Sequence, residues 1–439
     1  MKAGYWFGGY KIYAAGNFAS WFETINRCVA SRYWRARPWF RTEIIPILRR
    51  GLEAIPASNL AITQSSPFCR QTRMDKKRLM TVAHINRIGT ALPSHDVHAP
   101  FVAYMHKMLN TGKSEKVFDR MVQRSGIAHR YSVLPVDDLA TERTEEKSFY
   151  RLGSYPGTAQ RMRAYEKHAP GLVRDAVDAL DLRGQEAGIT HLVVASCTGF
   201  VAPGLDQILA KNLGLRSDLQ RTFVGFMGCS AAVPALRVAQ QAVLADPSAR
   251  VLVINVELCT LHLQETTDLE TALSFLLFGD GCSAALVTRD ETGIALHDFR
   301  AALIPESEDL ITWHIGDQGF DMYLSGKVPG RILQALREDL LREDAGGLLR
   351  GEGTQAVDLW AVHAGGRTIL DAVETGFALD NNALRESRAV LAEHGNMSSA
   401  TVMFVLKRML ANSRKGKRGL AMAFGPGVVA ETFRFSFSD

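Results

Sequence analysis

Apolar runs alternate with amphipathic stretches along the body of this chain. Strand-like runs occupy residues 191–196, 249–258 and 282–289, and their near-continuous Val, Leu and Ile content is typical of buried, largely parallel strands. Apolar residues recur at helical spacing in residues 203–215 and 235–247. This alternation predicts an α/β protein with helices on both faces of a sheet.

The last third of the chain repeats the same pattern. Residues 357–374 follow the order strand, turn, helix, and residues 396–410 indicate a helix that begins at a small polar cluster. Residues 418–437 indicate two strands joined through Gly-Pro-Gly, which is a turn signal. With one nucleophile-type turn in each part, the repeated order indicates an architectural duplication, whose halves we place at residues 80–300 and 301–439.

Composition changes sharply near residue 80. Residues 1–79 hold 14 Lys or Arg and 4 Asp or Glu, a balance of +10, whereas the remainder holds 37 basic and 42 acidic residues. The body therefore gives no reason to expect a nucleic acid as partner. We expect residues 1–79 to be an appendage, and interpret them as upstream sequence translated from an early start. An aromatic and basic arm for a membrane surface or a nucleic acid is the alternative.

Overall composition narrows the class of protein. The 439 residues are 46% hydrophobic and 22% charged, which is ordinary for a soluble globular protein. No apolar run approaches about 18 residues, so we expect no membrane-spanning segment. Six cysteines without a Cys-x-x-Cys pair favour neither a disulfide scaffold nor a zinc site, and indicate a cytoplasmic location. No dinucleotide or phosphate-loop fingerprint is present, so we expect neither a metal nor a nucleotide cofactor.

Cys229 lies where a strand-like run meets a helical stretch. Residues 222–227 before it are apolar and β-rich, and Gly228 marks a tight turn. Small or apolar positions then recur at helical spacing, namely Ala232, Leu236, Ala239 and Val243. A thiol there faces a helix N-terminus, whose unpaired N–H groups and dipole lower its pKa and make it a nucleophile. The alternative is a buried cysteine that acts as a small hydrophobe.

His363 and Asn396 also lie on turns at the ends of expected elements. His363 follows the apolar run LWAV, and Asn396 lies at an expected helix start. Each has an ordinary alternative, a core or surface histidine and a helix-capping asparagine. In open α/β sheets, however, catalytic groups gather at the carboxyl ends of strands. With Cys229 they allow acyl-thioester chemistry, in which a thiolate takes an acyl group and the two donors stabilise an oxyanion or enolate.

The order Cys, His, Asn also occurs in papain-like hydrolases. Those enzymes carry the cysteine near the mature N-terminus in a Cys-Gly-x-Cys-aromatic setting. Cys229 instead lies in the middle of the chain, in MGCSAAV. A hydrolase is therefore the weaker interpretation.

Six further segments carry a resemblance. They are GFMGCSAA, LFGDGCSAALV, WHIGDQGFDMYLSGKVPG, VHAGGRTILD, HGNMSSA and AFGPG, and they lie between about Met80 and Phe437. Together they resemble type III polyketide synthases, the chalcone synthase-like family of the thiolase fold, in a bacterial-type form. GNMSSA and FGPG distinguish that family from ketoacyl-carrier-protein synthases, whose synthase III-like members make a single condensation and are the alternative. A non-catalytic scaffold on this fold is a further alternative.

The resemblance implies a five-layer αβαβα fold of two duplicated halves, working as a homodimer. It implies CoA thioesters as substrates, with an acyl-CoA starter and malonyl-CoA and no cofactor. By resemblance, Cys229 holds the starter acyl group and His363 keeps it as a thiolate. With Asn396, His363 would stabilise the enolate formed when malonyl-CoA loses carbon dioxide. Iterative condensation and cyclisation would then give a resorcinol, pyrone or phloroglucinol-type product.

The resemblance also places a substrate pocket and a CoA site. Phe278 matches the gatekeeping phenylalanine between the CoA tunnel and the cavity, with an ordinary core aromatic as the alternative. The positions expected to contact substrate are Phe278, Ala202, Cys259, His262, Trp313, Met322, Ser398, Gly425, Pro426 and Gly427. The positions expected to bind CoA are Lys116, Arg120 and Arg124, for which a solvated helix face is the alternative.

Two pocket positions indicate which acyl-CoA starter the pocket accepts. Where plant members carry a methionine that reaches into the partner subunit's cavity, this chain has Ala202. The second gatekeeping phenylalanine matches Met322. These smaller or softer side chains leave room for an alkyl chain, so we expect a fatty acyl-CoA starter, as in bacterial members that make alkylresorcinols or alkylpyrones.

Overall fold

The computed structural model describes residues 4–7, 10–13, 82–109, 112–136, 148–182, 184–412 and 415–438. The chain divides into two compact units, residues 1–80 and 81–439. The described part of the first unit is an antiparallel pair of strands, β1 (Gly4–Phe7) and β2 (Tyr10–Tyr13). The rest of the appendage predicted for residues 1–79 lies outside the described residues, and the boundaries at residues 79 and 300 stay predictions.

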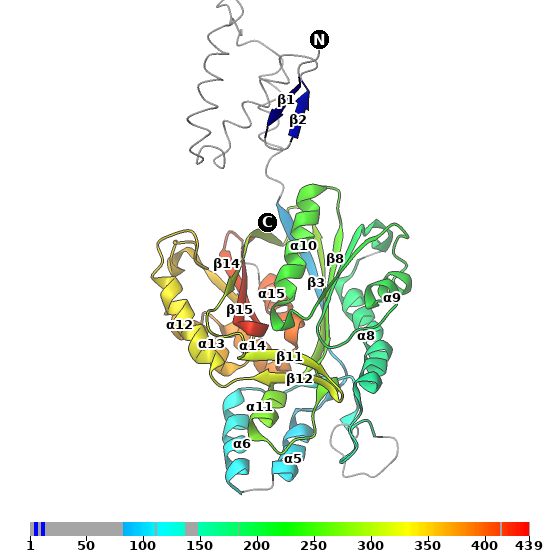
Figure 1. The fold of residues 1–439 in the computed structure, drawn as a ribbon, viewed down its shortest axis with the longest axis vertical. Coiled ribbons are helices and arrows are strands. Elements are labelled where there is room, and N and C mark those ends of the chain that lie inside the picture. The colour runs from blue at the N-terminus through cyan, green and yellow to red at the C-terminus, as the bar shows by residue number, and fades with distance from the viewer. Residues whose placement is uncertain are drawn as a thin grey trace, which may run out of the picture. The chain divides into compact units, whose positions relative to one another are not determined.

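Within the described residues of the second unit, one nine-stranded sheet forms the framework (Figure 1). Its strands, in spatial order, are β13 (Leu359–Val362), β14 (Arg418–Gly425), β15 (Val429–Phe437), β10 (Ile294–Leu303), β3 (Ala83–Ala91), β9 (Asp280–Thr288), β8 (Val251–Leu258), β6 (His191–Ser196) and β7 (Gln220–Gly225). The sheet has two halves, because β10 and β3 pair only through residues 294–296 and 83–85.

Both halves of the sheet share one strand order. β6, β8, β9 and β3 in the first half correspond to β13, β14, β15 and β10 in the second, and β7 adds an edge strand to the first. In each half the first of these pairs is parallel and the next two are antiparallel. The duplication predicted from the sequence is therefore present in the topology.

The prediction of largely parallel strands is wrong. Among the described strands of this sheet, only the pairs β6–β7, β6–β8 and β13–β14 are parallel. A continuous apolar run indicates only that both faces of the strand are buried. Helices cover both faces of this mixed sheet, so its antiparallel strands are as apolar as parallel ones would be.

The described helices follow the predicted alternation. They are α5 (His98–Leu109), α6 (Gly112–Ser125), α8 (Thr158–Leu180), α9 (Leu205–Asn212), α10 (Ala232–Ala245), α11 (Leu269–Leu277), α12 (Val328–Leu340), α13 (Arg367–Gly376), α14 (Arg385–His394) and α15 (Thr401–Ala411). Two small antiparallel sheets complete the unit, β4 (His95–Asp96) with β5 (Tyr131–Ser132), and β11 (Ile311–Gly316) with β12 (Gly319–Leu324).

Three hydrophobic clusters define five layers. The first cluster contains the buried faces of α10 and α15 together with strands of both halves of the sheet, so these two helices form the middle layer. The second contains α8 and the outer face of the first half, and the third contains α12, α13 and the outer face of the second half. The predicted αβαβα arrangement is confirmed.

The middle layer forms as the sequence pattern predicts. On α10 the predicted stripe of Ala232, Leu236, Ala239 and Val243 is completely buried. Small residues on this stripe let the helix lie close to both halves of the sheet. Consequently the N-terminal ends of α10 and α15 are held inside the protein.

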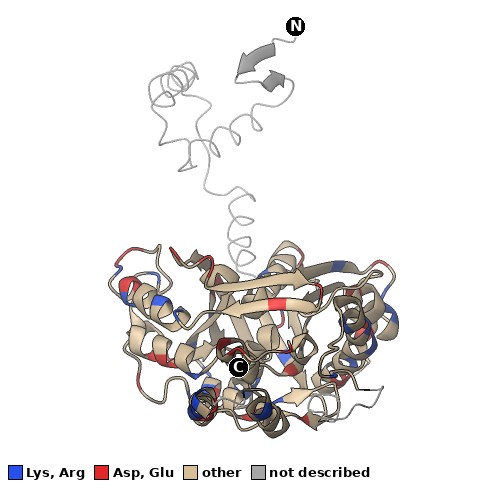
Figure 2. Ribbon diagram, turned by 60° about the horizontal axis from the view of Figure 1, so that its bottom comes forward, with Lys and Arg blue, Asp and Glu red and all other residues tan. Residues whose placement is uncertain are grey.

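The surface of the second unit carries both signs of charge. Lys and Arg are interspersed with Asp and Glu over the outer helices, whereas the central strands carry few charges (Figure 2). In the part of the chain that the structure describes, we find no helix long and apolar enough to cross a membrane.

Candidate active site

Cys229 lies at the entrance to the middle layer. β7 ends at Gly225, and the backbone turns through Phe226 and Gly228, which have φ values of +54° and +58°. Cys229 then sits in a short 3-10 turn, Gly228–Ser230, that leads into α10. A side chain at position 228 would place its Cβ 2.5 Å from Cδ of Pro426, so the turn requires glycine there. The strand-to-helix turn predicted from the sequence is confirmed.

Asn396 lies at the matching point of the second half, just before α15. Its Oδ1 and Nδ2 atoms each lie 3.9 Å from Sγ of Cys229. The amide is held in place, because the Ser398 N–H donates to its Oδ1 at 2.9 Å and its Nδ2 donates to the Gly365 carbonyl at 3.2 Å. One amide N–H therefore stays available for a group bound at the sulfur.

His363 follows β13 directly and faces the same cavity as Cys229 and Asn396. Its side chain is buried, and its backbone N–H donates to the Met422 carbonyl at 2.8 Å. Neither ring nitrogen has a hydrogen-bond partner among the described residues. Buried polar atoms normally have partners. These nitrogens therefore point to chemistry performed on a bound group.

Burial shifts the pKa values of both titratable groups in the site. It lowers the pKa of His363 to about 3, so the imidazole is neutral at neutral pH. Burial also raises the pKa of Cys229 to about 11, against smaller lowering effects of Ser398 and Asn396. The thiol pKa lowered by the helix N-terminus, as expected from the sequence, is contradicted. Removal of the sulfur from water is the largest cause of this shift.

A cavity of about 690 Å³ joins the three residues to the surface. Of the positions expected to contact substrate or CoA, its lining includes Phe278, Cys259, Trp313, Met322, Ser398, Gly425, Pro426 and Arg124. Trp313 and Met322 are opposite each other in the β11–β12 hairpin, which forms one wall. His363 and Asn396 are buried, whereas Arg124 is exposed, so Arg124 lies toward the mouth.

Five expected positions do not line the cavity. Lys116 and Arg120 are exposed on α6, where Nε of Arg120 donates to the Lys116 carbonyl at 3.2 Å. Ala202 is exposed in the loop before α9, and Gly427 lies beyond Pro426, where its carbonyl accepts from Ser307 at 3.0 Å. His262 is buried behind the wall. The resemblance placed all five at the substrate or the CoA site, but none of them lines the cavity.

His262 is part of the packing behind the hairpin. Its ring stacks on Phe320, with centroids 4.3 Å apart. Nδ1 accepts from the Phe320 N–H at 3.0 Å, and Nε2 lies 2.7 Å from the Thr198 carbonyl. With both nitrogens satisfied, His262 supports β12 and does not reach the substrate space.

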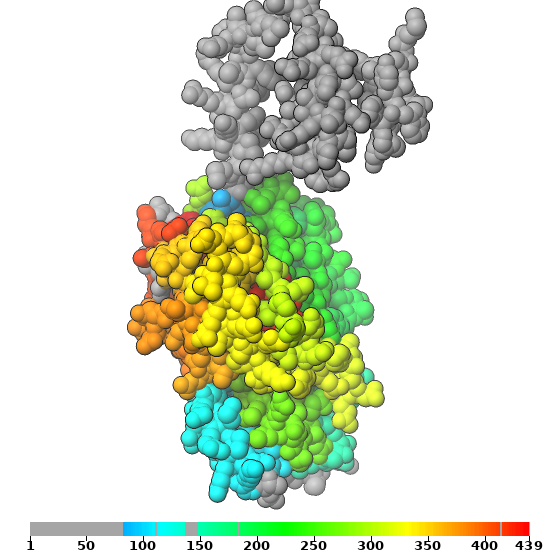
Figure 3. All heavy atoms as spheres, turned by 60° about the vertical axis from the view of Figure 1, so that its left-hand side comes forward, coloured from blue at the N-terminus to red at the C-terminus, as the bar shows by residue number. Residues whose placement is uncertain are grey.

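The structure adds residues that the sequence analysis missed. Cys197 lines the cavity, and its Sγ accepts from the Gly228 N–H at 3.0 Å, next to Cys229. Arg367 lines the mouth at the start of α13, and its Nη1 donates to the Arg124 carbonyl at 3.3 Å. Arg367 follows the HAGG segment directly, which was the available signal. Figure 3 shows the face on which α6, in cyan, lies next to the orange segment that includes α13.

Comparisons with known proteins identify the family of the chain. The family profile "Chalcone and stilbene synthases, N-terminal domain" matches residues 70–291, and the corresponding C-terminal domain matches residues 295–436. The chain belongs to the chalcone and stilbene synthase family. It is a type III polyketide synthase, and its thiolase-like fold follows from the structural matches below.

Two curated relatives illustrate the likeness. The alpha-pyrone synthesis polyketide synthase-like protein Pks18 of Mycobacterium tuberculosis is 32% identical over 375 residues, which cover 81% of this chain and 91% of the relative. The 1,3,6,8-tetrahydroxynaphthalene synthase of Streptomyces coelicolor is 33% identical over 323 residues, which cover 71% of this chain and 80% of the relative.

Solved structures of this enzyme class share the fold. PKS-I from the brown alga Ectocarpus siliculosus superposes with a TM-score of 0.73 at 33% identity, covering 82% of this chain and 99% of that one. The synthase of Streptomyces coelicolor named above superposes with a TM-score of 0.71 at 29% identity, covering 82% of this chain and all of that one.

Proposed function

We propose that this type III polyketide synthase extends an acyl-CoA starter with malonyl-CoA units by iterative decarboxylative condensation and then cyclises the product. The observation that carries the proposal is the convergence of Cys229, His363 and Asn396 in one cavity. The cavity opens between Arg124 and Arg367, two cations suited to the phosphates of CoA. The synthase III-like alternative is not favoured, because the matched proteins are type III polyketide synthases.

Starter loading is the first step. The Cys229 sulfur attacks the thioester carbonyl, its proton passes to the neutral His363 ring, and a C–S bond forms. The attack gives a tetrahedral oxyanion beside the sulfur. The C–S bond to CoA then breaks, and the CoA sulfur leaves with the proton carried by His363.

Chain extension is the second step. Malonyl-CoA loses carbon dioxide, and the electron pair of the broken C–C bond becomes an enolate. The enolate oxygen accepts from the Asn396 amide and from the N–H of His363. Because the pKa of His363 is low, the ring can donate this hydrogen bond without protonating the enolate. The enolate carbon attacks the acyl-Cys229 carbonyl, and the sulfur leaves, ready to receive the extended chain.

The cavity wall supports a fatty acyl starter. Around the hairpin and α11 the lining is mostly aliphatic, with Leu273, Leu276, Leu277, Ile311, Met322, Leu324 and Val328. A volume of about 690 Å³ lies within the range of sites that enclose whole ligands, roughly 300–1,000 Å³. An alkyl chain would be removed from water there. Pyrone or resorcinol products would follow from closure of the extended chain.

A homodimer in the cytoplasm completes the proposal. β7 is an edge strand, and it ends at a group of partly exposed apolar residues that includes Phe200 and Met227, each 37% exposed. Ala202 is exposed beside them. An edge strand and an apolar patch that meet at one place suit a second copy of the chain.

The four described cysteines are free, in keeping with a reducing compartment. The expectation of catalysis without a metal or cofactor stays an expectation.

The test is product analysis with malonyl-CoA and a panel of acyl-CoAs from acetyl to palmitoyl, with 4-coumaroyl-CoA included. Cys229→Ala should lower product formation by about a thousandfold or more, because the acyl group has no attachment point. Cys282→Ala is the matched control, since Cys282 is buried in β9 outside the cavity and should keep most of the activity. Polyketide formed by Cys229→Ala would contradict the mechanism. Preference for 4-coumaroyl-CoA would contradict only the fatty acyl starter.

A further inference from the structure

Arg130 is a buried cation that the mechanism above does not use. It follows α6 and is only 2% exposed. Its Nε donates to Nδ1 of His98 at 3.1 Å, and its guanidinium carbon lies 4.6 Å from the centre of the Phe101 ring. Its Nη1 donates to the carbonyls of Phe275 at 3.0 Å and Phe278 at 2.6 Å. A buried charge is retained only where its contacts repay the loss of water.

The two carbonyls belong to the end of α11. Carbonyls in the last turn of a helix have no partner within the helix, and a cation is favoured there. Phe275 lies in the last turn, and Phe278 is the first residue beyond it, with extended backbone at φ −87° and ψ 137°. By bridging both carbonyls, Arg130 sets the direction in which the chain carries Phe278 away from the helix and into the cavity wall.

The same residues are joined to Asn396. Phe278 and Asn396 form an isolated parallel β-bridge. The Asn396 N–H donates to the Leu277 carbonyl at 2.8 Å, and the Gly279 N–H donates to the Asn396 carbonyl at 3.0 Å. The residues on either side of Phe278 are therefore hydrogen-bonded to the backbone of Asn396.

The stem of Arg130 reaches the other side of this bridge. Gly395, with a φ of +67°, precedes Asn396, and a Cβ at position 395 would lie 2.8 Å from Cγ of Arg130. The side chain thus contacts both segments of the bridge, through its guanidinium on one and its methylene groups on the other. Burial lowers the pKa of Arg130 to about 10, with Asp96 and Asp280 as the nearby negative charges, so the group is charged at neutral pH.

We propose that Arg130 is a positioning residue that fixes Phe278 and Asn396 relative to each other, and thereby holds the Asn396 amide over the Cys229 sulfur. This inference rests on the proposed function. It assigns Arg130 to the decarboxylation and condensation steps, because both need Asn396. Starter loading depends on Cys229 and on His363, which directly follows β13 and whose ring makes no hydrogen bond to Arg130.

The experiment separates these steps. Loading is followed by the mass of the enzyme after a short exposure to lauroyl-CoA, and decarboxylation by the acetyl-CoA formed from malonyl-CoA alone. In Arg130→Met, loading should stay within about twofold of wild type while decarboxylation falls by about tenfold or more, since small misplacements of catalytic groups have effects of this size. Arg130→Lys, which keeps the charge but has one nitrogen in place of the guanidinium fork, should give a decarboxylation rate between those of wild type and Arg130→Met.

Arg161→Met is the matched control. Arg161 is also buried and donates to carbonyls, at Pro156, Leu261 and Leu263, but it makes no hydrogen bond to the Phe278–Asn396 bridge. If Arg130 only supports folding, the two methionine variants should lose thermal stability alike and lose loading and decarboxylation in the same proportion. That result, or unchanged decarboxylation in Arg130→Met, would overturn the proposal.

The outcomes also separate this inference from the function on which it rests. If wild type forms no condensation product from lauroyl-CoA or any other acyl-CoA of the panel, the proposed function fails. If wild type condenses and the ratio of decarboxylation to loading is the same in all variants, only the role of Arg130 fails. If Arg130→Met does not fold, the ratio of decarboxylation to loading is compared between wild type and Arg130→Lys. An equal ratio in these two proteins would then contradict the role of Arg130.

Discussion

At the scale of single residues, reactivity in this site depends on how burial shifts two pKa values in opposite directions. A high pKa for Cys229 and a low one for His363 both favour uncharged side chains. An uncharged ring with a free nitrogen can accept the thiol proton at the moment of attack. Asn396 needs no proton at all and contributes an oriented dipole. In the proposed mechanism, the thiol and the ring therefore serve loading, and the ring and the amide serve extension, without a fixed charge.

This view predicts the pH dependence of alkylation by iodoacetamide, which reacts with the thiolate. In His363→Ala, Cys229 should react slowly at pH 7, and its rate should rise about tenfold per pH unit up to pH 10, because the thiol pKa lies above this range. Wild type should react faster at pH 7, since His363 takes the proton. The label is located at Cys229 by peptide mass. Equal rates for the two proteins at pH 7 would contradict the role of His363.

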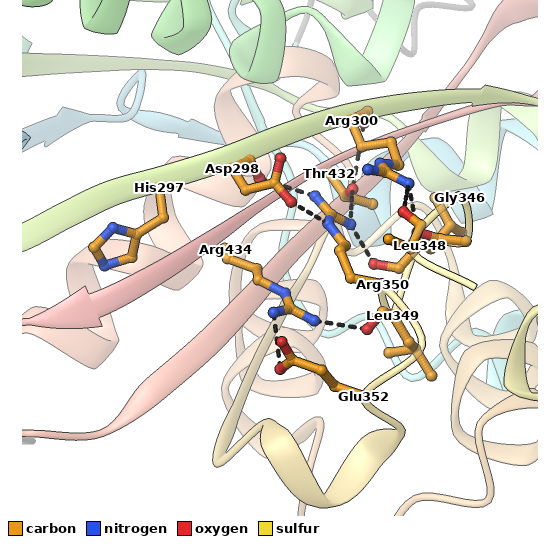
Figure 4. A network of polar contacts seen from close by, with 12 residues as sticks. His297, Asp298, Arg300, Gly346, Leu348, Leu349, Arg350, Glu352, Thr432 and Arg434 are labelled. Atoms are coloured by element: carbon orange, nitrogen blue, oxygen red, sulfur yellow. Dashed lines mark hydrogen bonds and ion pairs between the residues drawn. The ribbon is translucent and has the colours of Figure 1, made fainter. Parts of the chain in front are cut away.

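At the scale of elements, arginines pin a long connection to the sheet. Residues 341–358 join α12 to β13, and Arg300, Arg350 and Arg434 hold them against β10 and β15 (Figure 4). Nη2 of Arg434 donates to the Leu349 carbonyl at 2.6 Å, and its Nη1 pairs with Glu352 at 2.9 Å. Arg350 pairs with Asp298 and donates to its carbonyl at 2.9 Å. These side chains satisfy backbone groups that no regular element supplies.

Arg350→Ala should therefore destabilise the protein. Its side chain is 7% exposed, and its loss leaves Asp298 and several carbonyls without their donor, which should cost about 2–4 kcal/mol. Urea unfolding followed by fluorescence should show a lower midpoint. Activity below the transition should persist, because none of these arginines lines the cavity. Arg342→Ala is the control, since its pair with Asp344 in the same connection is exposed. Equal midpoints for the two variants would contradict the argument.

At the scale of the whole molecule, the partly exposed aromatic cluster near β7 is suited to contact with a partner surface. Phe200 lies 5.1 Å from Phe226 and 6.2 Å from Phe320, measured between ring centres, so one continuous cluster runs from the surface to the hairpin that walls the cavity. A second copy docked on this cluster would bury it. Such docking would also stiffen the wall, because Phe320 is part of β12.

Phe200→Glu should convert the proposed dimer to a monomer in sedimentation velocity experiments at micromolar concentration, because the new charge would be buried without a partner. Polyketide formation should fall together with the dimer. Leu341→Glu is the control, since Leu341 is 82% exposed at the end of α12 and away from the cluster. A Phe200→Glu protein that sediments like wild type would contradict the proposed interface.

Much of this protein could be predicted from local patterns. The stripe on α10, the Gly-Pro-Gly link between β14 and β15 and the turns that carry Cys229 and Asn396 are all confirmed, because each depends on residues close together in the chain. The pairing direction of the strands was not predictable, since apolar runs report burial and not direction. The resemblance placed Ala202 and His262 at the substrate, yet neither lines the cavity.

By itself, the sequence determined the fold class, the family and which three side chains we propose to react, because spacing and short motifs carry that information locally. Only the tertiary structure decided how those side chains behave. Burial raised the pKa of Cys229, and the meeting of α11 with the segment before α15 brought Arg130 beneath Phe278 and Asn396. Desolvation and contacts between distant segments arise only when the chain is packed, so no local pattern records them.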